Sequence, residues 1–189
     1  MSATLLPTAL PPHPAPTTGS PRRSTGNAAL AISLALRPDV WRPLVRFQEE
    51  TRWTRLLTPD AMAGAVDPAL HTDLAAAEVW LLSWLPGQGT ALHDHGPSGG
   101  AFAVAQGALT ERVVGAGRGG RGPHEVTADL AVGRVRFFGP NYVHQVGNGG
   151  TEPAVSVHVY APRLTVMNTY RVEDNRLERV GTEQAGVDW

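Results

Sequence analysis

The stretch that decides the fold runs from Trp84 to Gly107 and reads WLPGQGTALHDHGPSGGAFAVAQG. At its centre lies His93-Asp94-His95, and in an extended chain residues two apart point to the same face. Both imidazoles would then converge on one point while Asp94 faces away. Because imidazole binds iron, zinc, copper and nickel well, this pair indicates a metal site. The ordinary alternative is two histidines in a surface loop.

A second stretch, Gly133 to Asn148, reads GRVRFFGPNYVHQVGN. Together the two stretches resemble the two motifs of the cupin superfamily, whose members hold a metal inside a small β-barrel. The matching positions are Gly87, His93, His95, Gly107, Gly133, His144 and Asn148. The chain departs from the usual pattern at Gly100 in place of glutamate, and at Gly139 and Asn141 in place of proline and glycine.

Short segments with the character of strands follow one another from residue 52 onward, separated by glycine-rich breaks. Several of them alternate apolar and polar residues, as half-buried strands do. Many short strands with turn signals favour a barrel or sandwich. We therefore expect an all-β fold, a small jelly-roll-like cupin barrel, with strands at 79–85, 101–106, 109–114, 132–138, 155–160 and 164–172.

The rest of the chain is expected to frame this barrel. Residues 1–26 carry six prolines and are predicted to be a disordered leader. Two N-terminal helices, at 27–36 and 39–48, would lie in a segment 27–50 that packs on the barrel. The barrel itself would occupy residues 51–180, and residues 181–189 would form a tail.

Arg22-Arg23 precede an apolar stretch and resemble a twin-arginine signal. The stretch at 28–36 is too short for such a signal, and no cleavage site with small residues follows it. We therefore expect a cytoplasmic protein.

Composition excludes several chemistries. The chain has no cysteine, and all 16 of its basic residues other than histidine are arginine. It therefore lacks disulfides, zinc–thiolate sites, thiol nucleophiles, and lysines for Schiff bases or a P-loop. A net charge of −1 gives no field that would attract nucleic acid, and no apolar run is long enough to span a membrane.

Four segments carry a more specific resemblance, to the cysteine dioxygenase type I family and its bacterial thiol dioxygenases that bind substrate through arginine. They are Trp84–Gly87 with His93–His95, Tyr142–Asn148, Ser156–Tyr160 and Arg52–Arg55. The resemblance implies an Fe²⁺ enzyme that adds both atoms of O₂ to the sulfur of a small thiol. With cysteine the product would be cysteine sulfinic acid, which would place the protein in cysteine catabolism.

The resemblance also assigns roles to individual residues. The iron ligands would be His93, His95 and His144. The catalytic line would be Tyr160, His158 and Ser156, and these positions share one face of a strand. Substrate would be bound by Arg55, which would hold its carboxylate, and by Trp53 and Trp84.

Two departures from the family pattern bear on these roles. Mammalian relatives have a cysteine near position 100 that cross-links to the catalytic tyrosine, whereas this chain has Gly100, so Tyr160 carries no thioether. Trp53 stands where tyrosine is usual, and its indole offers an N–H but no hydroxyl.

Two other functions stay open at this point. One is a dioxygenase for a related thiol such as 3-mercaptopropionate, although relatives that use it commonly have glutamine where this chain has Arg55. The other is a non-catalytic cupin that senses or stores a metal or a small acid. The expected partners are a small thiol and O₂. We expect a monomer by default, since no feature of the sequence bears on oligomerisation.

Overall fold

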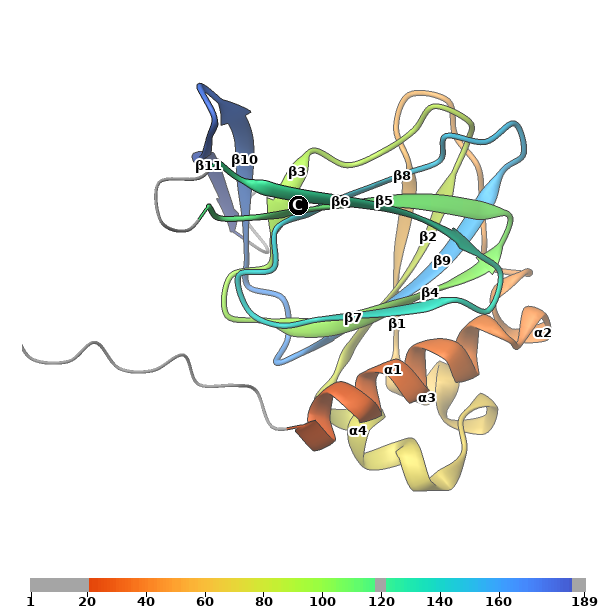
Figure 1. The fold of residues 1–189 in the computed structure, drawn as a ribbon. Helices are drawn as coiled ribbons and strands as arrows, with labels where there is room; N and C mark the ends of the chain where they lie inside the picture. Colours follow the sequence, from red (N-terminus) through yellow and green to blue (C-terminus); the bar gives the residue numbers. More distant parts are fainter. Residues whose placement is uncertain (1–20, 118–121, 185–189) are drawn as a thin grey trace, which may run out of the picture.

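The computed structural model describes residues 21–117 and 122–184. Two antiparallel sheets face each other and enclose the interior of a barrel (Figure 1). One sheet has the strand order β1-β2-β9-β4-β7 and the other β11-β10-β3-β8-β5-β6. The prediction of an all-β cupin barrel with N-terminal helices is confirmed.

The strands are β1 (Trp53–Leu57), β2 (Glu78–Trp84), β3 (Leu92–Asp94), β4 (Gly99–Gln106), β5 (Ala108–Gly115), β6 (His124–Ala131), β7 (Val135–Phe138), β8 (His144–Gly147), β9 (Ala154–Ala161), β10 (Val166–Glu173) and β11 (Arg176–Gln184). The helices are α1 (Pro21–Ala35), α2 (Pro38–Trp41), α3 (Pro59–Met62) and α4 (His71–Ala76), with 3₁₀ turns at Ala63–Ala65 and Pro68–Leu70.

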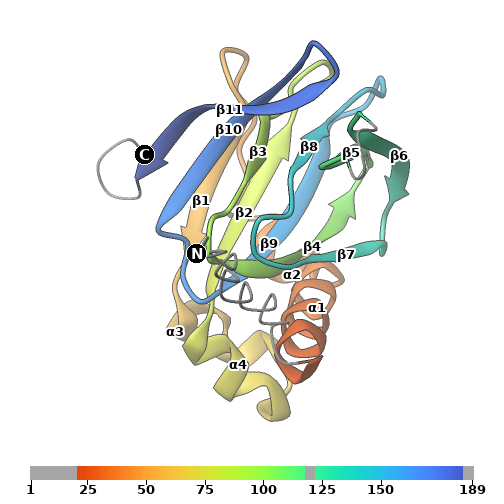
Figure 2. The ribbon, with the colours of Figure 1, turned by 60° about the vertical axis from the view of Figure 1, so that its left-hand side comes forward.

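The helices cover the outer face of the five-stranded sheet (Figures 1 and 2). Leu30 and Leu34 of α1 are buried in one apolar cluster with Val157 and Val159 of β9. The other face of β9 looks into the barrel, so this strand is buried along nearly its whole length. Because neighbouring residues of a strand point to opposite faces, valines meet the helices while polar side chains alternate with them inside the barrel.

A second apolar cluster fills one part of the barrel interior. Trp84, Phe102, Leu109 and Leu130 belong to it, and all of them are essentially fully buried. These residues come from both sheets, so the cluster holds the sheets together and closes that part of the interior. The polar site described below occupies the remainder.

The N-terminal helices differ from their predicted bounds. Helix α1 begins at Pro21, within the predicted leader, because proline suits the first turn of a helix, where its missing N–H is not needed. Helix α2 ends at Trp41 rather than at residue 48. Pro43 contributes to this, since it has no N–H to continue the helical hydrogen bonds.

Strands β1, β3, β6, β8 and β11, and the helical segment between β1 and β2, were not predicted. Strand β11 runs to Gln184, so part of the predicted tail pairs with β10 as a hairpin at the edge of its sheet. Residues 1–20 of the predicted leader and 185–189 of the predicted tail lie outside the described residues. Among the described helices, none is long and apolar enough to cross a membrane.

Replacing Leu30 by alanine tests the contribution of α1 to the barrel. Leu30 is fully buried against β9, so we expect Leu30→Ala to lower the free energy of unfolding by about 2–5 kcal/mol in urea titrations. Leu36→Ala, at a position 58% exposed just beyond the helix, should change it by less than about 0.5 kcal/mol. Equal effects of the two changes would mean that α1 does not stabilise the barrel.

Candidate metal and substrate site

Three buried histidines meet inside the barrel. His93 lies in β3, His95 directly follows that strand, and His144 begins β8. His93 and His144 are cross-strand partners, and each of the three residues is at most 6% exposed. Their ligating nitrogens all lie within 4.8 Å of one another. The three predicted metal ligands therefore come together as one cluster.

The free nitrogens of this cluster fit a cation. Nδ1 of His93 lies 2.9 Å from the carbonyl oxygen of Ala91, which leaves its Nε2 free to act as a ligand. His95 Nδ1 and His144 Nε2 are buried with no hydrogen-bond partner among the described residues. Buried polar atoms are rarely left in this state, and a bound metal would satisfy the nitrogens that face it.

Burial also sets the protonation of the cluster. Desolvation, helped by the neighbouring imidazoles, lowers the pKa of His93 to about 3 and holds the pKa of His95 well below its usual value. Both rings are therefore neutral at physiological pH. Neutral imidazole is the form that coordinates a metal, so the site is prepared to bind one without first losing protons.

Asp94 points away from the cluster and fixes the segment between the two histidines. Its Oδ1 accepts hydrogen bonds from the Gly96 backbone N–H and from Asn168 Nδ2, both at 2.8 Å. Its Oδ2 accepts from the Tyr170 hydroxyl at 2.7 Å. The carboxylate thus ties the histidine segment to β10 and limits the rotation of His93 and His95.

Gly100 leaves no place for a side chain beside the cluster. A Cβ at this position would lie 2.7 Å from Cζ of Phe138 and would collide with the Val159 carbonyl oxygen. The Phe138 ring stacks near His95 with centroids 4.8 Å apart. The space where most cupins have a carboxylate ligand is therefore taken by an apolar ring, and the candidate ligands in this cluster are three imidazoles.

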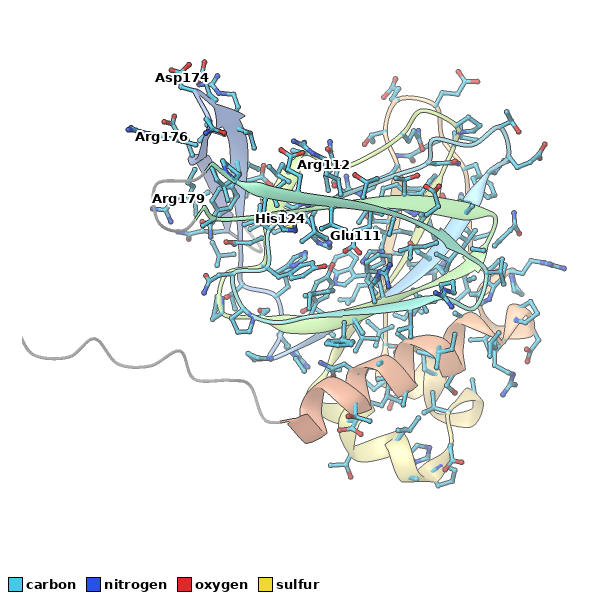
Figure 3. All side chains as sticks on the ribbon, viewed as in Figure 1. Glu111, Arg112, His124, Asp174, Arg176 and Arg179 are labelled. Atoms are coloured by element: carbon cyan, nitrogen blue, oxygen red, sulfur yellow. The ribbon has the colours of Figure 1, made fainter. Side chains whose placement is uncertain are left out.

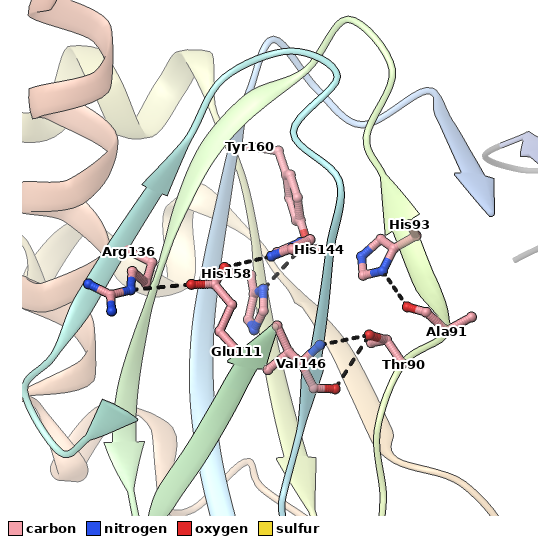
Figure 4. Close-up of polar contacts among 9 residues, drawn as sticks. All are labelled: Thr90, Ala91, His93, Glu111, Arg136, His144, Val146, His158 and Tyr160. Atoms are coloured by element: carbon pink, nitrogen blue, oxygen red, sulfur yellow. Dashed lines mark hydrogen bonds and ion pairs between the residues drawn. The ribbon is translucent and has the colours of Figure 1, made fainter. Parts of the chain in front are cut away.

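Ser156, His158 and Tyr160 form a hydrogen-bonded line on the inner face of β9 (Figure 4 shows the part near the histidines). Ser156 Oγ lies 2.9 Å from His158 Nε2, and the Tyr160 hydroxyl lies 3.5 Å from His158 Nδ1, the outer limit of a hydrogen bond. Burial lowers the pKa of His158 and raises the pKa of Tyr160, so both are neutral. These three residues share one face of the strand, as their spacing predicts.

Trp84 extends this line by one residue. Its indole N–H donates to Ser156 Oγ at 2.9 Å, and the same oxygen lies beside His158 Nε2. When Ser156 donates to Nε2, His158 carries its proton on Nδ1 and can donate toward the Tyr160 oxygen. In that arrangement the hydrogen of the Tyr160 hydroxyl is left to donate to another group. Trp84 is fully buried and is not one of the residues that line the cavity described next.

A cavity of about 160 Å³ opens beside Tyr160. Its lining is Arg52, Thr54, Trp80, Leu82, Tyr160, Leu164, Met167 and Glu183. The Arg52 guanidinium lies 5.6 Å from the centroid of the Trp84 ring, and its Nε is buried without a partner among the described residues. Burial lowers the pKa of Arg52, but a guanidinium stays charged, so a cation faces the cavity.

Arg55 and Trp53, predicted to bind substrate, do not lie on this cavity. Arg55 is exposed, and Trp53 packs against the apolar cluster under the helices. Strand alternation is the reason: Arg52 and Thr54 face inward with Trp84 and Leu82 of β2, so the residues between them face outward. The arginine that the structure puts beside Tyr160 is Arg52, two strand positions from Thr54.

Three charged residues near the site were missed from the sequence: Arg52, Glu111 and Glu183. Arg52 could have been found if the pairing of β1 with β2 had been known, because alternation along the paired strands puts Arg52 on the same face as Trp84. Glu183 required knowledge that residues 181–184 form a strand. Glu111 is buried at 1% exposure, yet its sequence surroundings are those of an ordinary half-exposed strand.

An antiparallel barrel with three buried histidines facing one another defines a metal-binding cupin. The family model for cysteine dioxygenase type I matches residues 37–173, which is most of the chain. The chain therefore belongs to the cysteine dioxygenase type I family. Membership and the histidine cluster together make it a metal-dependent enzyme.

Several solved structures are similar to part of this chain. The protein TT1209 from Thermus thermophilus is 24% identical, with a TM-score of 0.47 over 65% of this chain and 93% of that one. An uncharacterized protein with a double-stranded β-helix domain from Klebsiella pneumoniae is 19% identical, with a TM-score of 0.44 over 74% and 93%. Oxalate decarboxylase from Lactobacillus farciminis is 18% identical, with a TM-score of 0.46 over 64% of this chain and 31% of that one.

The packing around Gly100 can be tested by adding one methyl group. Because a Cβ there would meet backbone and the Phe138 ring, we expect Gly100→Ala to lower the free energy of unfolding by about 1–3 kcal/mol. Gly139→Ala is the matched control, since nothing lies within 4 Å of the Cβ it would add. Chemical denaturation of both variants checks this, and a Gly100→Ala protein as stable as the control would contradict the packing.

Proposed function

We propose that this protein is an iron-dependent thiol dioxygenase that oxidises L-cysteine with O₂ to cysteine sulfinic acid. The observation that carries the proposal is the meeting of three elements in one interior: a buried three-histidine cluster, the Tyr160 hydroxyl and the charged Arg52 on the adjoining cavity. In the reaction both oxygen atoms become bonded to sulfur, which is oxidised as O₂ is reduced, and no further oxidant is consumed.

The metal would be held by His93, His95 and His144. When bound, Fe²⁺ would supply coordination positions for the thiolate and O₂ and the redox chemistry that joins them. Three neutral ligands leave the full charge of the metal uncompensated by its direct ligands, which favours an anionic donor such as a thiolate.

Arg52 would bind the substrate carboxylate. A guanidinium presents donors in a planar fork that matches a carboxylate, and here it is largely removed from water without an acidic hydrogen-bond partner in the described residues. The Trp84 ring beneath it limits its movement. A carboxylate that enters the cavity would therefore accept the hydrogen bonds that an exposed arginine gives to water.

Glu183 supports cysteine over 3-mercaptopropionate. It lines the same cavity as Arg52 and interacts with that arginine electrostatically. A cavity that offers both a cation and a carboxylate suits a substrate with both charges. Cysteine has an amino group as well as a carboxylate, whereas 3-mercaptopropionate has only the carboxylate and would meet Glu183 without compensation.

Tyr160 would donate a hydrogen bond to the reacting substrate. With the His158 proton on Nδ1, the Tyr160 hydroxyl hydrogen is free to reach the substrate, and burial keeps the phenol protonated by raising its pKa. A protein that only stores or senses a metal has no need for this ordered line. The line therefore supports a catalytic role over the alternative of a sensor.

Replacing each of the two candidate arginines by glutamine tests which of them binds the substrate carboxylate. We expect Arg52→Gln to lower kcat/KM for cysteine roughly 30-fold to several thousand-fold, which corresponds to a loss of about 2–5 kcal/mol of binding free energy in the transition state. The readout is O₂ uptake by the iron-loaded protein. Oxidation of cysteamine, which has no carboxylate, should change much less. Arg55→Gln is the matched control and should behave as wild type. If Arg55→Gln alone impaired cysteine oxidation, Arg52 would lose its role.

Replacing Tyr160 by phenylalanine tests the catalytic line. Loss of a positioned proton donor typically lowers the rate by about 10²–10⁴-fold, so Tyr160→Phe should keep its iron and fold while sulfinate formation falls by this factor. Oxygen consumed per sulfinate should rise. Tyr142→Phe removes a phenol near His144 that lies outside the line, and should not show this loss. Normal turnover of Tyr160→Phe would favour the metal-sensor alternative instead.

A further inference from the structure

A buried carboxylate on β5 has no part in the function proposed above. Glu111 is 1% exposed and lies between the two sheets, whereas its neighbour Arg112 points to the surface (Figure 3). On that surface Arg112 pairs with Glu125 of β6 at 2.8 Å. Strand alternation thus separates an exposed ion pair from an interior acid within two successive residues.

Glu111 contacts one residue of the histidine cluster directly. Its Oε1 lies 2.8 Å from His144 Nδ1, and its Oε2 lies 3.2 Å from Nε of Arg136 (Figure 4). The contact follows from the register of the sheet, because His144 pairs with Val113, two positions along β5 from Glu111 on the same face. The carboxylate accepts the Nδ1 hydrogen of His144 and leaves Nε2 to the cluster.

The desolvation of Glu111 makes a purely structural ion pair a poor explanation. Removing a carboxylate from water is expensive, and a partly exposed arginine compensates for only part of that cost. Apolar side chains fill another part of this interior at no such cost. A charge kept here at such a cost is expected to act on the group that it touches, which is His144.

We propose that Glu111 is a positioning residue that fixes His144 for the metal and supplies negative charge that the three neutral ligands lack. A carboxylate that accepts from the far nitrogen of a histidine ligand sets its tautomer and makes it a stronger donor. Gly100 and Phe138 exclude a carboxylate ligand from the usual place. Glu111 brings the charge in through the imidazole ring of His144 instead of by direct coordination.

Arg136 limits this effect. It is 35% exposed in its side chain and draws charge from the other oxygen of Glu111. The strength of the charge that reaches His144 therefore depends on an arginine that touches solvent. This inference rests on the three-histidine metal site and is independent of which thiol, if any, the protein oxidises.

Anaerobic Fe²⁺ titration against a competing chelator tests the proposal, together with the reduction potential of the bound iron. Glu111→Gln keeps the size of the side chain but removes its charge, so we expect iron affinity to fall about 10–100-fold and the potential to rise. Arg136→Gln should move both quantities in the opposite direction, because Glu111 then loses its counter-charge. Glu125→Gln, the acid of the surface pair, should change neither.

The opposite signs separate this role from a structural one. If the Glu111–Arg136 pair only stabilised the barrel, both substitutions would weaken iron binding in parallel with the melting temperature of the metal-free protein. Wild-type affinity and potential in Glu111→Gln would overturn the proposal. Should Glu111→Gln fail to fold, Arg136→Gln decides alone, and an unchanged potential in that variant overturns it. Neither readout involves a thiol, so failure of the dioxygenase proposal would be seen separately.

Discussion

Strand β9 has to satisfy two environments at once, and the rest of the structure is arranged around that constraint. Its odd-numbered valines are buried against α1, and its even-numbered polar residues face the barrel interior. A shift of one residue in its pairing would bury His158 under the helices and turn valine toward the histidine cluster. The helices that cover the sheet therefore secure the line of Ser156, His158 and Tyr160, although none of them contributes a residue to it.

Burial determines which side chains of the interior are neutral and which are charged. His93 and His95 are held neutral because charging them there is costly, and Phe138 fills the position from which a carboxylate would otherwise reach a metal. Among the described residues, charged side chains surround the cluster: Arg52 on the side of the cavity, Glu111 behind His144, and Asp94 between His93 and His95 but turned away from them. A cation at the centre would thus lie near charges of both signs.

The parts of this structure that could be predicted from sequence are those set by local spacing. Two histidines separated by one residue, and the alternation of Ser156, His158 and Tyr160, define a face without reference to any other strand. Which arginine enters the cavity is decided instead by the pairing of β1 with β2, across the intervening helical segment. Arg55, predicted to hold the substrate carboxylate, therefore does not line this cavity, whereas Arg52 of the same segment does. Glu111 could not be found for the same reason, since its interior position follows from the register between β5 and β8.

The hairpin of β10 and β11 divides two tasks between two strands. Strand β10 holds the metal segment through Asn168 and Tyr170, whereas β11 contributes Glu183 to the wall of the substrate cavity. The two tasks meet at Thr182 of β11, whose hydroxyl donates to Asn168 Oδ1 at 2.8 Å and so supports the bond from Asn168 to Asp94. Substitutions at Glu183 during evolution would therefore change the cavity alone, whereas substitutions at its neighbour Thr182 would reach the histidine segment as well.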